Sequence, residues 1–295
     1  MHPDPVFDPV FDTPTAVRSW SDAAHRTGLT VALVPTMGAL HRGHVALIEH
    51  ARTLADRVVV SIFVNPLQFG EQNDFDHYPR PIADDLAECR RAGVDAVYAP
   101  TAAAMYPPGF ETRVVAGSLG ASMEGAARPG HFDGVVTVVT KLFAATRPDV
   151  GVFGQKDFQQ LAIIRRLAAD LDLGVQVIGA PTVREPDGLA LSSRNRRLDT
   201  AHRAAAACVP RAIAAAVERA ATHGARVDDV IAAATEVLRS EPLATLDYVS
   251  VFDADTLEIV EALTEDRRRN GRTRIALAAR FGEVRLIDND DLFRR

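Results

Sequence analysis

Near-continuous apolar runs alternate with segments of helical spacing through the first half of the chain. The apolar runs predict strands over residues 29–34, 58–64, 95–100, 150–153 and 175–178. Between them, apolar residues recur every three or four positions and predict helices over residues 43–56, 82–93 and 157–171. Residues 134–146 fit either element, but their length and the Arg-Pro pair that follows favour a helix.

Strands that are apolar on both faces and alternate with helices are typical of a parallel sheet covered on both sides. The pattern therefore predicts an α/β fold with a Rossmann-like, doubly wound parallel sheet. Such sheets bind ligands at the carboxyl ends of their strands, where the strand order reverses. Four segments that follow predicted strands are polar or carry glycine, namely residues 35–44, 65–70, 154–157 and 184–195.

The pattern changes after about residue 184. Residues 200–240 are rich in alanine at helical spacing, and three later segments alternate like antiparallel strands joined by turns, at 248–258, 274–282 and 283–289. We predict a Rossmann-like domain over residues 1–183, a smaller C-terminal α+β domain over residues 184–295, and a ligand cleft between them. The proline-rich residues 1–12 are expected to form a flexible arm.

Composition narrows the class of partner. The net charge of −6 makes a general basic face for nucleic acid unexpected. The two cysteines, Cys89 and Cys208, lie far apart and predict reduced thiols in a cytoplasmic protein. The N-terminal residues lack the pattern of a signal peptide, and no apolar stretch approaches about 18 residues, so no membrane contact is expected.

Two histidines, His41 and His44, flank Arg42 and Gly43 where a helix is expected to begin. Gly43 lets a ligand approach the backbone closely, because it has no Cβ. The helix N-terminus offers N–H groups and a positive dipole end, which favour anions. Neutral imidazoles donate hydrogen bonds to phosphate oxygens without a permanent charge. This combination predicts a site for the phosphates of a nucleoside triphosphate, with a helix cap carrying two surface histidines as the alternative.

Two further polar segments suit the same ligand. Residues 191–195, Leu-Ser-Ser-Arg-Asn, supply hydroxyls, a guanidinium and an amide for the phosphates of a leaving pyrophosphate. Residues 154–157, Gly-Gln-Lys-Asp, follow a strand and open a helix, so that Lys156 can neutralise phosphate and Asp157 can accept from ribose hydroxyls. Taken singly, a polar interdomain loop and a common turn remain open for these two segments.

Together, the early His-Arg-Gly-His and the late Ser-Ser-Arg resemble the HIGH and KMSKS signatures of the nucleotidylyltransferase superfamily. The chain also resembles the pantothenate synthetase (pantoate–β-alanine ligase) family in seven segments that follow the family's order, at 35–44, 63–69, 76–80, 128–135, 140–143, 154–161 and 187–195. The C-terminal part fits the family in size and class but carries no matching motif. Residues 154–157 read GQKD, where the family often has GEKD.

This resemblance implies the ATP-dependent condensation of (R)-pantoate with β-alanine to pantothenate, through a pantoyl adenylate, in coenzyme A biosynthesis. AMP and pyrophosphate would be released. The resemblance implies Mg²⁺ with ATP as co-substrate, no tightly bound organic cofactor, and a homodimer without nucleic acid or membrane partners. It also implies that the first domain binds ATP and pantoate and that the second acts as a lid.

The family's functional residues carry over to matching positions. Catalysis would fall to His44, His41, Lys156 and Arg194. ATP would contact Pro35, Thr36, Met37, Gly38, His41, His44, Gly154, Gln155, Lys156, Asp157, Val183, Leu191, Ser192, Ser193 and Arg194. Pantoate and β-alanine would contact Gln68, Gln160 and Asn65. Asp84 and Asp85 open a helix and complement its dipole, and the family suggests that they lie near Mg²⁺.

Two other functions remain open. A nucleotidylyltransferase acting on a phosphorylated acceptor would need further basic residues, whereas residues 63–69 and 157–161 are rich in amides. A nucleotide-binding module without turnover would explain the fold. The retention of His41, His44 and the two basic residues Lys156 and Arg194 argues against such a module.

Overall fold

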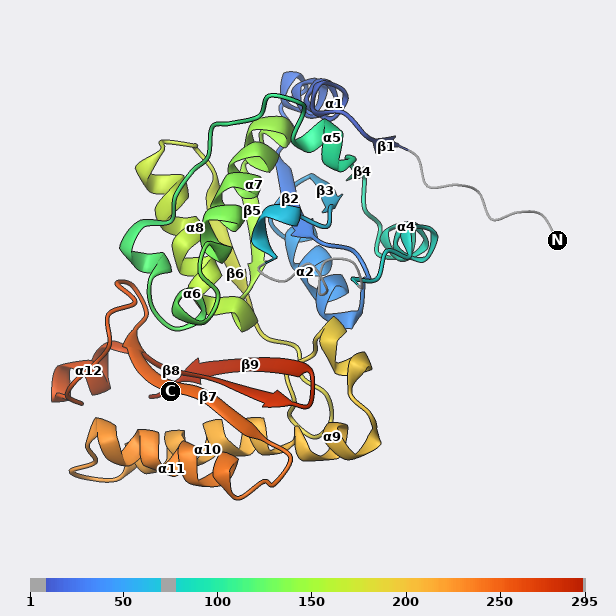
Figure 1. Ribbon diagram of the computed structural model, residues 1–295. Helices are drawn as coiled ribbons and strands as arrows, with labels where there is room; N and C mark the ends of the chain where they lie inside the picture. Colours follow the sequence, from blue (N-terminus) through green and yellow to red (C-terminus); the bar gives the residue numbers. More distant parts are fainter. Residues whose placement is uncertain (1–8, 70–77, 294–295) are drawn as a thin grey trace. The chain divides into compact units, whose positions relative to one another are not determined.

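The computed structural model describes residues 9–69 and 78–293 (Figure 1). The chain divides into two compact units. The first comprises Met1–Gln155 and Ile163–Pro181, and the second comprises Lys156–Ala162 and Thr182–Arg295. Lys156–Ala162, which the sequence pattern grouped with the first domain, therefore belongs to the second unit.

Six parallel strands form the sheet of the first unit, in the order β1-β4-β3-β2-β5-β6. They are β1 (Val10–Phe11), β2 (Val31–Thr36), β3 (Arg57–Ile62), β4 (Ala96–Tyr98), β5 (Val150–Gly154) and β6 (Gln176–Ala180). Each neighbouring pair runs parallel, which confirms the predicted doubly wound sheet. Chain order runs outward from β2 through β3 on one side and begins again at β5 on the other, so the switch point lies between β2 and β5.

The flexible arm predicted over residues 1–12 is wrong where β1 forms. Val10 and Phe11 pair with β4 as an edge strand, and the Phe11 ring lies 6.4 Å from that of Trp20. Residues 1–8 of the predicted arm lie outside the described residues. The helix α1 (Pro14–Arg26) was not predicted either, although Thr13 caps it through a hydrogen bond from the Ala16 N–H.

Helices cover both faces of this sheet (Figure 1). On one face, α2 (Arg42–Arg52) and α4 (Ile82–Arg91) share a buried core with Ala32 and Val34 of β2. Cys89 of α4 lies in this core, and burial raises its pKa to about 12, which suits a packing residue. On the other face, α7 (His131–Thr146) packs on β2 and α1, which confirms the helix predicted over residues 134–146. Shorter helices are η1 (Pro66–Gln68), α5 (Ala102–Met105), η2 (Gly117–Gly120) and α6 (Glu124–Ala127).

The turn η3 (Gln155–Asp157) and the helix α8 (Phe158–Asp170) follow β5, as predicted. The second unit has an antiparallel sheet, β7 (Thr245–Asp253), β8 (Thr273–Phe281) and β9 (Val284–Asp291), which confirms the α+β prediction. The helices α10 (Cys208–Ala221) and α11 (Val227–Arg239) pack closely together and cover one face of the sheet. The other elements are η4 (Ser193–Arg197), α9 (Thr200–Ala205) and α12 (Glu265–Asn270).

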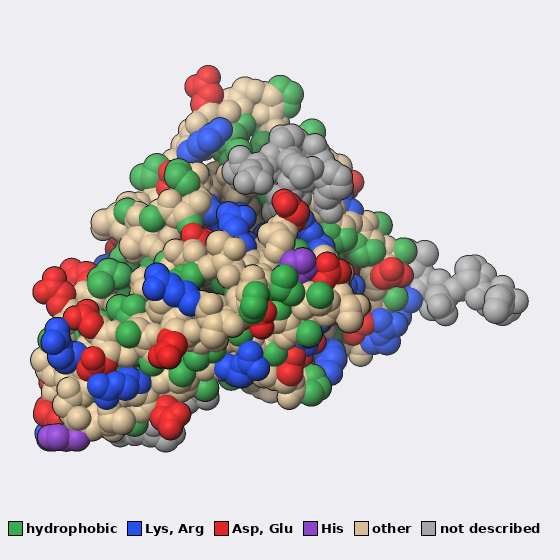
Figure 2. All heavy atoms as spheres, turned by 60° about the horizontal axis from the view of Figure 1, so that its bottom comes forward, with side chains coloured by type: hydrophobic (Ala, Val, Ile, Leu, Met, Phe, Trp, Pro, Cys, Tyr) green, Lys and Arg blue, Asp and Glu red, His purple; other side chains and the backbone are tan. Residues whose placement is uncertain are grey.

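Charged side chains of both signs are interspersed on the face shown in Figure 2. Several charged residues of the chain pair with one another, such as Arg219 with Asp229 and Arg272 with Asp255. Such mixing is the expected surface of a chain whose positive and negative residues nearly balance. Within residues 9–69 and 78–293, no helix combines the length and the apolar character that crossing a membrane requires.

Candidate active site

The first polar segment leaves the sheet where β2 ends. Thr36 donates to the Ser61 carbonyl of β3 at 2.7 Å and accepts from the Gly38 N–H at 3.2 Å. The loop over residues 37–41 therefore begins at a fixed point on the sheet. This point lies at the carboxyl end of β2, beside the switch point. The N–H of Gly38, a residue predicted to contact ATP, therefore already donates to the last residue of β2.

A buried carboxylate holds the same loop from the side of α4. The Asp85 Oδ2 accepts from the Ala39 N–H at 2.9 Å, and Oδ1 accepts from the Leu40 N–H at 2.7 Å. Asp85 is only 2% exposed, whereas its neighbour Asp84 is exposed. A Cβ at position 38 would lie 2.8 Å from Asp85 Oδ2, and Gly38 has φ of +80°, so only glycine fits this approach. This positioning contact was not found by sequence reasoning, which considered Asp85 only as a helix cap or a magnesium neighbour.

The two histidines form the mouth of α2. His41 is the N-cap, and its Nδ1 accepts from the Gly43 N–H at 3.1 Å. The Nδ1 of His44 accepts from the His41 N–H at 3.3 Å, and the rings stack with centroids 4.1 Å apart. Because each Nδ1 is an acceptor, the proton of each neutral ring resides on Nε2. The helix cap and the phosphate site, which the sequence left as alternatives, are therefore compatible, since capping makes each Nε2–H a donor.

Gln68 lies beside this loop. Its Nε2 donates to the Met37 sulfur at 3.2 Å, and its Oε1 accepts from the Asn65 amide at 2.9 Å. Two of the predicted ligand segments, 35–44 and 65–70, therefore meet in the first unit. A thioether is a weak acceptor, so the Gln68 amide retains most of its capacity to donate to a stronger one.

The direction of the Gln68 amide is determined by backbone groups and one phenol. Asn65 Oδ1 accepts from the Leu67 N–H at 3.2 Å, and its Nδ2 donates to the Gly134 carbonyl at 3.1 Å. These backbone partners allow only one orientation of the Asn65 amide. The Tyr106 hydroxyl donates to the same Oδ1 at 2.8 Å, and burial raises its pKa, which keeps it protonated. Sequence reasoning missed Tyr106, because it belongs to none of the recognised segments.

The segment 128–135, known from the sequence only as a resemblance, anchors the Gln68 backbone. Arg128 donates to the Gln68 carbonyl at 3.1 Å, and His131 Nδ1 lies 2.8 Å from the same oxygen. Gly134 permits the close approach of α7, since a Cβ there would lie 2.3 Å from the Leu67 carbonyl oxygen. This contact explains why glycine occupies the first turn of α7.

The second unit holds Lys156, Asp157 and Gln160 around the start of α8. The Lys156 Nζ lies 3.7 Å from Asp157 Oδ1, and the Lys156 carbonyl accepts from the Asn289 side chain at 2.7 Å. Gln160 is partly buried. Gln155, in the first unit, donates through Nε2 to the Gly179 carbonyl at 3.2 Å. A glutamate carboxylate lacks that donor, so GQKD gains an anchor on β6 that GEKD would not have.

The late polar segment is also a folded loop. Leu191 N–H donates to the Val183 carbonyl at 2.9 Å, so the two residues predicted to bind ATP are neighbours. Ser192 caps η4, because its hydroxyl accepts from the Arg194 N–H at 3.2 Å. Asn195 donates to Glu185 at 2.7 Å and closes the loop. Ser193 and Arg194 open η4 behind this cap.

Comparisons with known proteins identify the family of the chain. The pantoate–β-alanine ligase family model matches residues 9–290. A pantothenate synthetase from Acidothermus cellulolyticus is 54% identical over 269 residues, which are 90% of this chain and 87% of the relative. The crystal structure of pantothenate synthetase from Thermus thermophilus is 44% identical with a TM-score of 0.88, and the match covers 97% of this chain and 99% of that one.

A second solved structure is a pantoate–β-alanine ligase from Francisella tularensis complexed with beta-gamma ATP and β-alanine. It is 31% identical with a TM-score of 0.78, and the match covers 97% of this chain and 98% of that one. These matches extend through the C-terminal region, for which the sequence offered no motif. With both the sequence and the sheet topology in agreement over nearly its whole length, the chain belongs to the pantoate–β-alanine ligase family.

Proposed function

We propose that this chain condenses pantoate with β-alanine in two steps, through a pantoyl adenylate. A free carboxylate is a poor acylating agent. Its oxygen therefore first attacks the α-phosphorus of ATP, the bond to the β-phosphate breaks, and pyrophosphate leaves. The amine of β-alanine then attacks the acyl carbon, AMP leaves with the activated oxygen, and the nitrogen loses a proton. Positioning and charge stabilisation accelerate both steps, without a covalent enzyme intermediate.

The observation that carries this proposal is the contact between Met37 and Gln68. It places the Gln68 amide beside the loop over residues 37–41. At the end of this loop, His41 and His44 present their Nε2–H groups as donors. The histidines suit the triphosphate, with His44 stabilising charge in the transition state. The amide suits pantoate, because a neutral donor binds a carboxylate without neutralising it, and the carboxylate stays nucleophilic.

Roles in the second unit follow from the two loops that it holds. Lys156 would neutralise phosphate charge, and Ser192, Ser193 and Arg194 would bind the departing pyrophosphate. Gln160 would contact pantoate. Across both units, the remaining residues predicted to bind ATP would line the nucleotide through backbone or ribose contacts, namely Pro35, Thr36, Met37, Gly38, Gly154, Gln155, Asp157, Val183 and Leu191.

Magnesium would reach the site on the triphosphate of ATP. In the two described stretches of the chain, no group of three His, Cys, Asp or Glu side chains is arranged to hold a metal ion. Both oxygens of Asp85 accept backbone N–H groups, which supports a positioning role for this carboxylate. The role near Mg²⁺ that was predicted for Asp84 and Asp85 stays a prediction.

Assembly and location extend the proposal. We propose a cytoplasmic homodimer in which the first unit and Lys156–Ala162 bind ATP and pantoate, while Thr182–Arg295 acts as a lid. Both cysteines, Cys89 and Cys208, are free and buried, which supports a reducing compartment. Sedimentation at assay concentrations tests the dimer, and a monomer mass would refute it.

Replacing Tyr106 by phenylalanine is expected to raise the KM for pantoate about fivefold and to leave the KM for ATP within twofold. The substitution removes one hydrogen bond, worth about 1 kcal/mol, from the chain that orients Asn65 and Gln68. Steady-state kinetics measure both constants. Tyr98→Phe is the matched control, because Tyr98 is a buried tyrosine that lies within β4. Equal changes in the two constants would contradict an orienting role.

Pyrophosphate exchange into ATP tests the reaction itself. With Mg²⁺ present, exchange should depend on pantoate, and adding β-alanine should yield AMP and pantothenate. Exchange with another acid but not with pantoate would keep the adenylation chemistry and reject the substrate. ATP binding without exchange for any acid would favour a module that lacks turnover.

A further inference from the structure

Strand β9 ends in a run of polar residues, Asp288, Asn289, Asp290 and Asp291. Two of them are buried, since Asp288 is 1% exposed and Asn289 is 4% exposed. Burying a carboxylate or an amide is costly unless its polar atoms find partners. The partners of these two residues therefore indicate what the end of β9 contributes.

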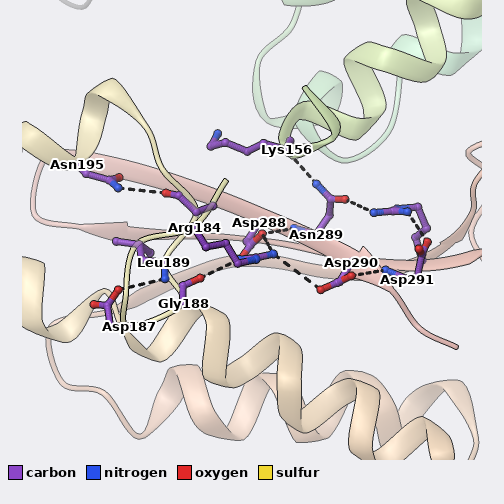
Figure 3. Close-up of polar contacts among 12 residues, drawn as sticks. Lys156, Arg184, Asp187, Gly188, Leu189, Asn195, Asp288, Asn289, Asp290 and Asp291 are labelled. Atoms are coloured by element: carbon purple, nitrogen blue, oxygen red, sulfur yellow. Dashed lines mark hydrogen bonds and ion pairs between the residues drawn. The ribbon is translucent and has the colours of Figure 1, made fainter. Parts of the chain in front are cut away.

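Asp288 binds Arg184, at the start of the loop that carries Ser192–Arg194. Its carboxylate accepts two hydrogen bonds from the Arg184 guanidinium, at 2.7 and 3.0 Å, in a paired geometry (Figure 3). Arg184 also donates to the Gly188 carbonyl at 3.0 Å. Together with the Asn195–Glu185 hydrogen bond, these contacts hold the loop from residue 184 to the cap at Ser192.

Asn289 binds the turn that carries Lys156, the other candidate phosphate-binding segment. Its Nδ2 donates to the Lys156 carbonyl at 2.7 Å (Figure 3). Its Oδ1 accepts from Arg274 at 2.8 Å. A carbonyl can only accept and a guanidinium can only donate, so these partners determine the orientation of the amide. The Arg274 guanidinium is itself held, because it lies 4.0 Å from the centre of the Phe158 ring and pairs with Asp291.

Adjacent residues of β9 thus contact two segments, and each contacted residue lies more than 100 positions before its partner in β9. Successive side chains on a strand point to opposite faces, so neighbouring positions can contact different segments. The Asn289–Lys156 hydrogen bond spans 133 positions and the Arg184–Asp288 pair spans 104, yet both end on the same dipeptide. All of these residues belong to the second unit.

We propose that Asp288 and Asn289 are positioning residues that hold the Lys156 turn and the Ser192–Arg194 loop in register for the phosphates of ATP and for the departing pyrophosphate. This inference rests on the phosphate roles proposed above for those two loops. Neither residue touches the substrates; each acts through the backbone of a loop that does. The expected signature is therefore a loss toward ATP and pyrophosphate that exceeds any loss toward pantoate, because Gln68 of the first unit also binds pantoate.

The test substitutes Asn289→Asp in the full-length chain. Aspartate keeps an oxygen for Arg274 but cannot donate to the Lys156 carbonyl. We expect the KM values for ATP and pyrophosphate in pantoate-dependent exchange to rise about tenfold, a loss typical of one buried hydrogen bond, and the KM for pantoate to stay within twofold. Asn289→Ser, which is too short to reach and adds no charge, should behave in the same way. Asn270→Asp, at an exposed site in the same unit, is the matched control and should leave all three KM values unchanged.

A double-mutant cycle separates positioning from general stability. In a Lys156→Ala background, Asn289→Asp should change ATP binding, measured by calorimetry, less than threefold. The same tenfold loss in both backgrounds, or equal losses toward ATP and pantoate, would overturn the proposal. If Lys156→Ala changed neither ATP binding nor the KM for pyrophosphate, the role of Lys156 would be wrong, and this inference would fall with it. Loss of exchange in the unsubstituted chain would instead reject the proposed reaction.

Discussion

Replacing His44 by alanine is expected to lower the turnover number by about 10²-fold or more while ATP affinity changes far less. The Nε2–H of His44 is directed by the hydrogen bond that its Nδ1 accepts from the His41 N–H. A donor of this kind acts mainly on charge that develops at phosphorus, so its loss affects the chemical step. Single-turnover formation of pantoyl adenylate measures that step directly.

The His44→Ala variant also loses a helix cap, which costs roughly 1 kcal/mol of stability. His44→Gln separates this structural effect, because glutamine at the third position of a helix can restore the capping hydrogen bond. We expect the glutamine variant to regain stability but not turnover. His50→Ala, in the last turn of the same helix, serves as the control. An unchanged turnover number in His44→Ala would remove this residue from the mechanism.

Replacing Asp85 by asparagine is expected to lower kcat/KM for ATP about 10²-fold, because the loop over residues 37–41 loses one of its two anchors. The asparagine oxygen would keep one of the two hydrogen bonds, but its NH₂ would face the other N–H, that of Ala39 or Leu40, and two donors repel there. Thermal unfolding should shift to lower temperature as well. Steady-state kinetics with varied ATP provide the measurement.

Asp84→Asn is the matched control, because Asp84 precedes Asp85 on the same helix and is exposed. We expect its kcat/KM for ATP to stay within twofold of the unsubstituted chain. If both asparagine variants lose activity equally, and excess Mg²⁺ restores both, the carboxylates act near the metal and the positioning role of Asp85 is wrong. Magnesium titration of both variants therefore decides between the two roles.

The fold was largely predictable because its main signal is local. Strands such as β2 and β3 are apolar on both faces, and only a sheet covered on both sides buries such strands completely. The edge strand β1 was not predictable, since two residues carry no periodicity and their order comes from pairing with β4. The helix α1 had a readable start at Thr13 and Pro14, which sequence reasoning passed over.

The candidate site divides in the same way. The chemistry of some site residues can be inferred from short sequence segments without a fold, as for His41, His44, Gln68 and Lys156. The residues that position these side chains cannot be inferred in this way. Tyr106 reaches Asn65 across 41 positions, and Asp85 reaches Ala39 across 46. The polar end of β9 was visible in the sequence as an acidic and amide run, but nothing local indicated which loops it would hold.

The sequence by itself determined which side chains can bind phosphate, carboxylate and hydroxyl groups, because that chemistry resides in residue types and short spacings. It also determined the α/β class, because alternation of apolar strands and helices is a local property. The tertiary structure decided the tautomer that His44 presents, the direction of the Gln68 amide and the loops that Asp288 and Asn289 hold. Each of these depends on hydrogen bonds of about 3 Å, and only the folded chain brings such donors and acceptors within that distance.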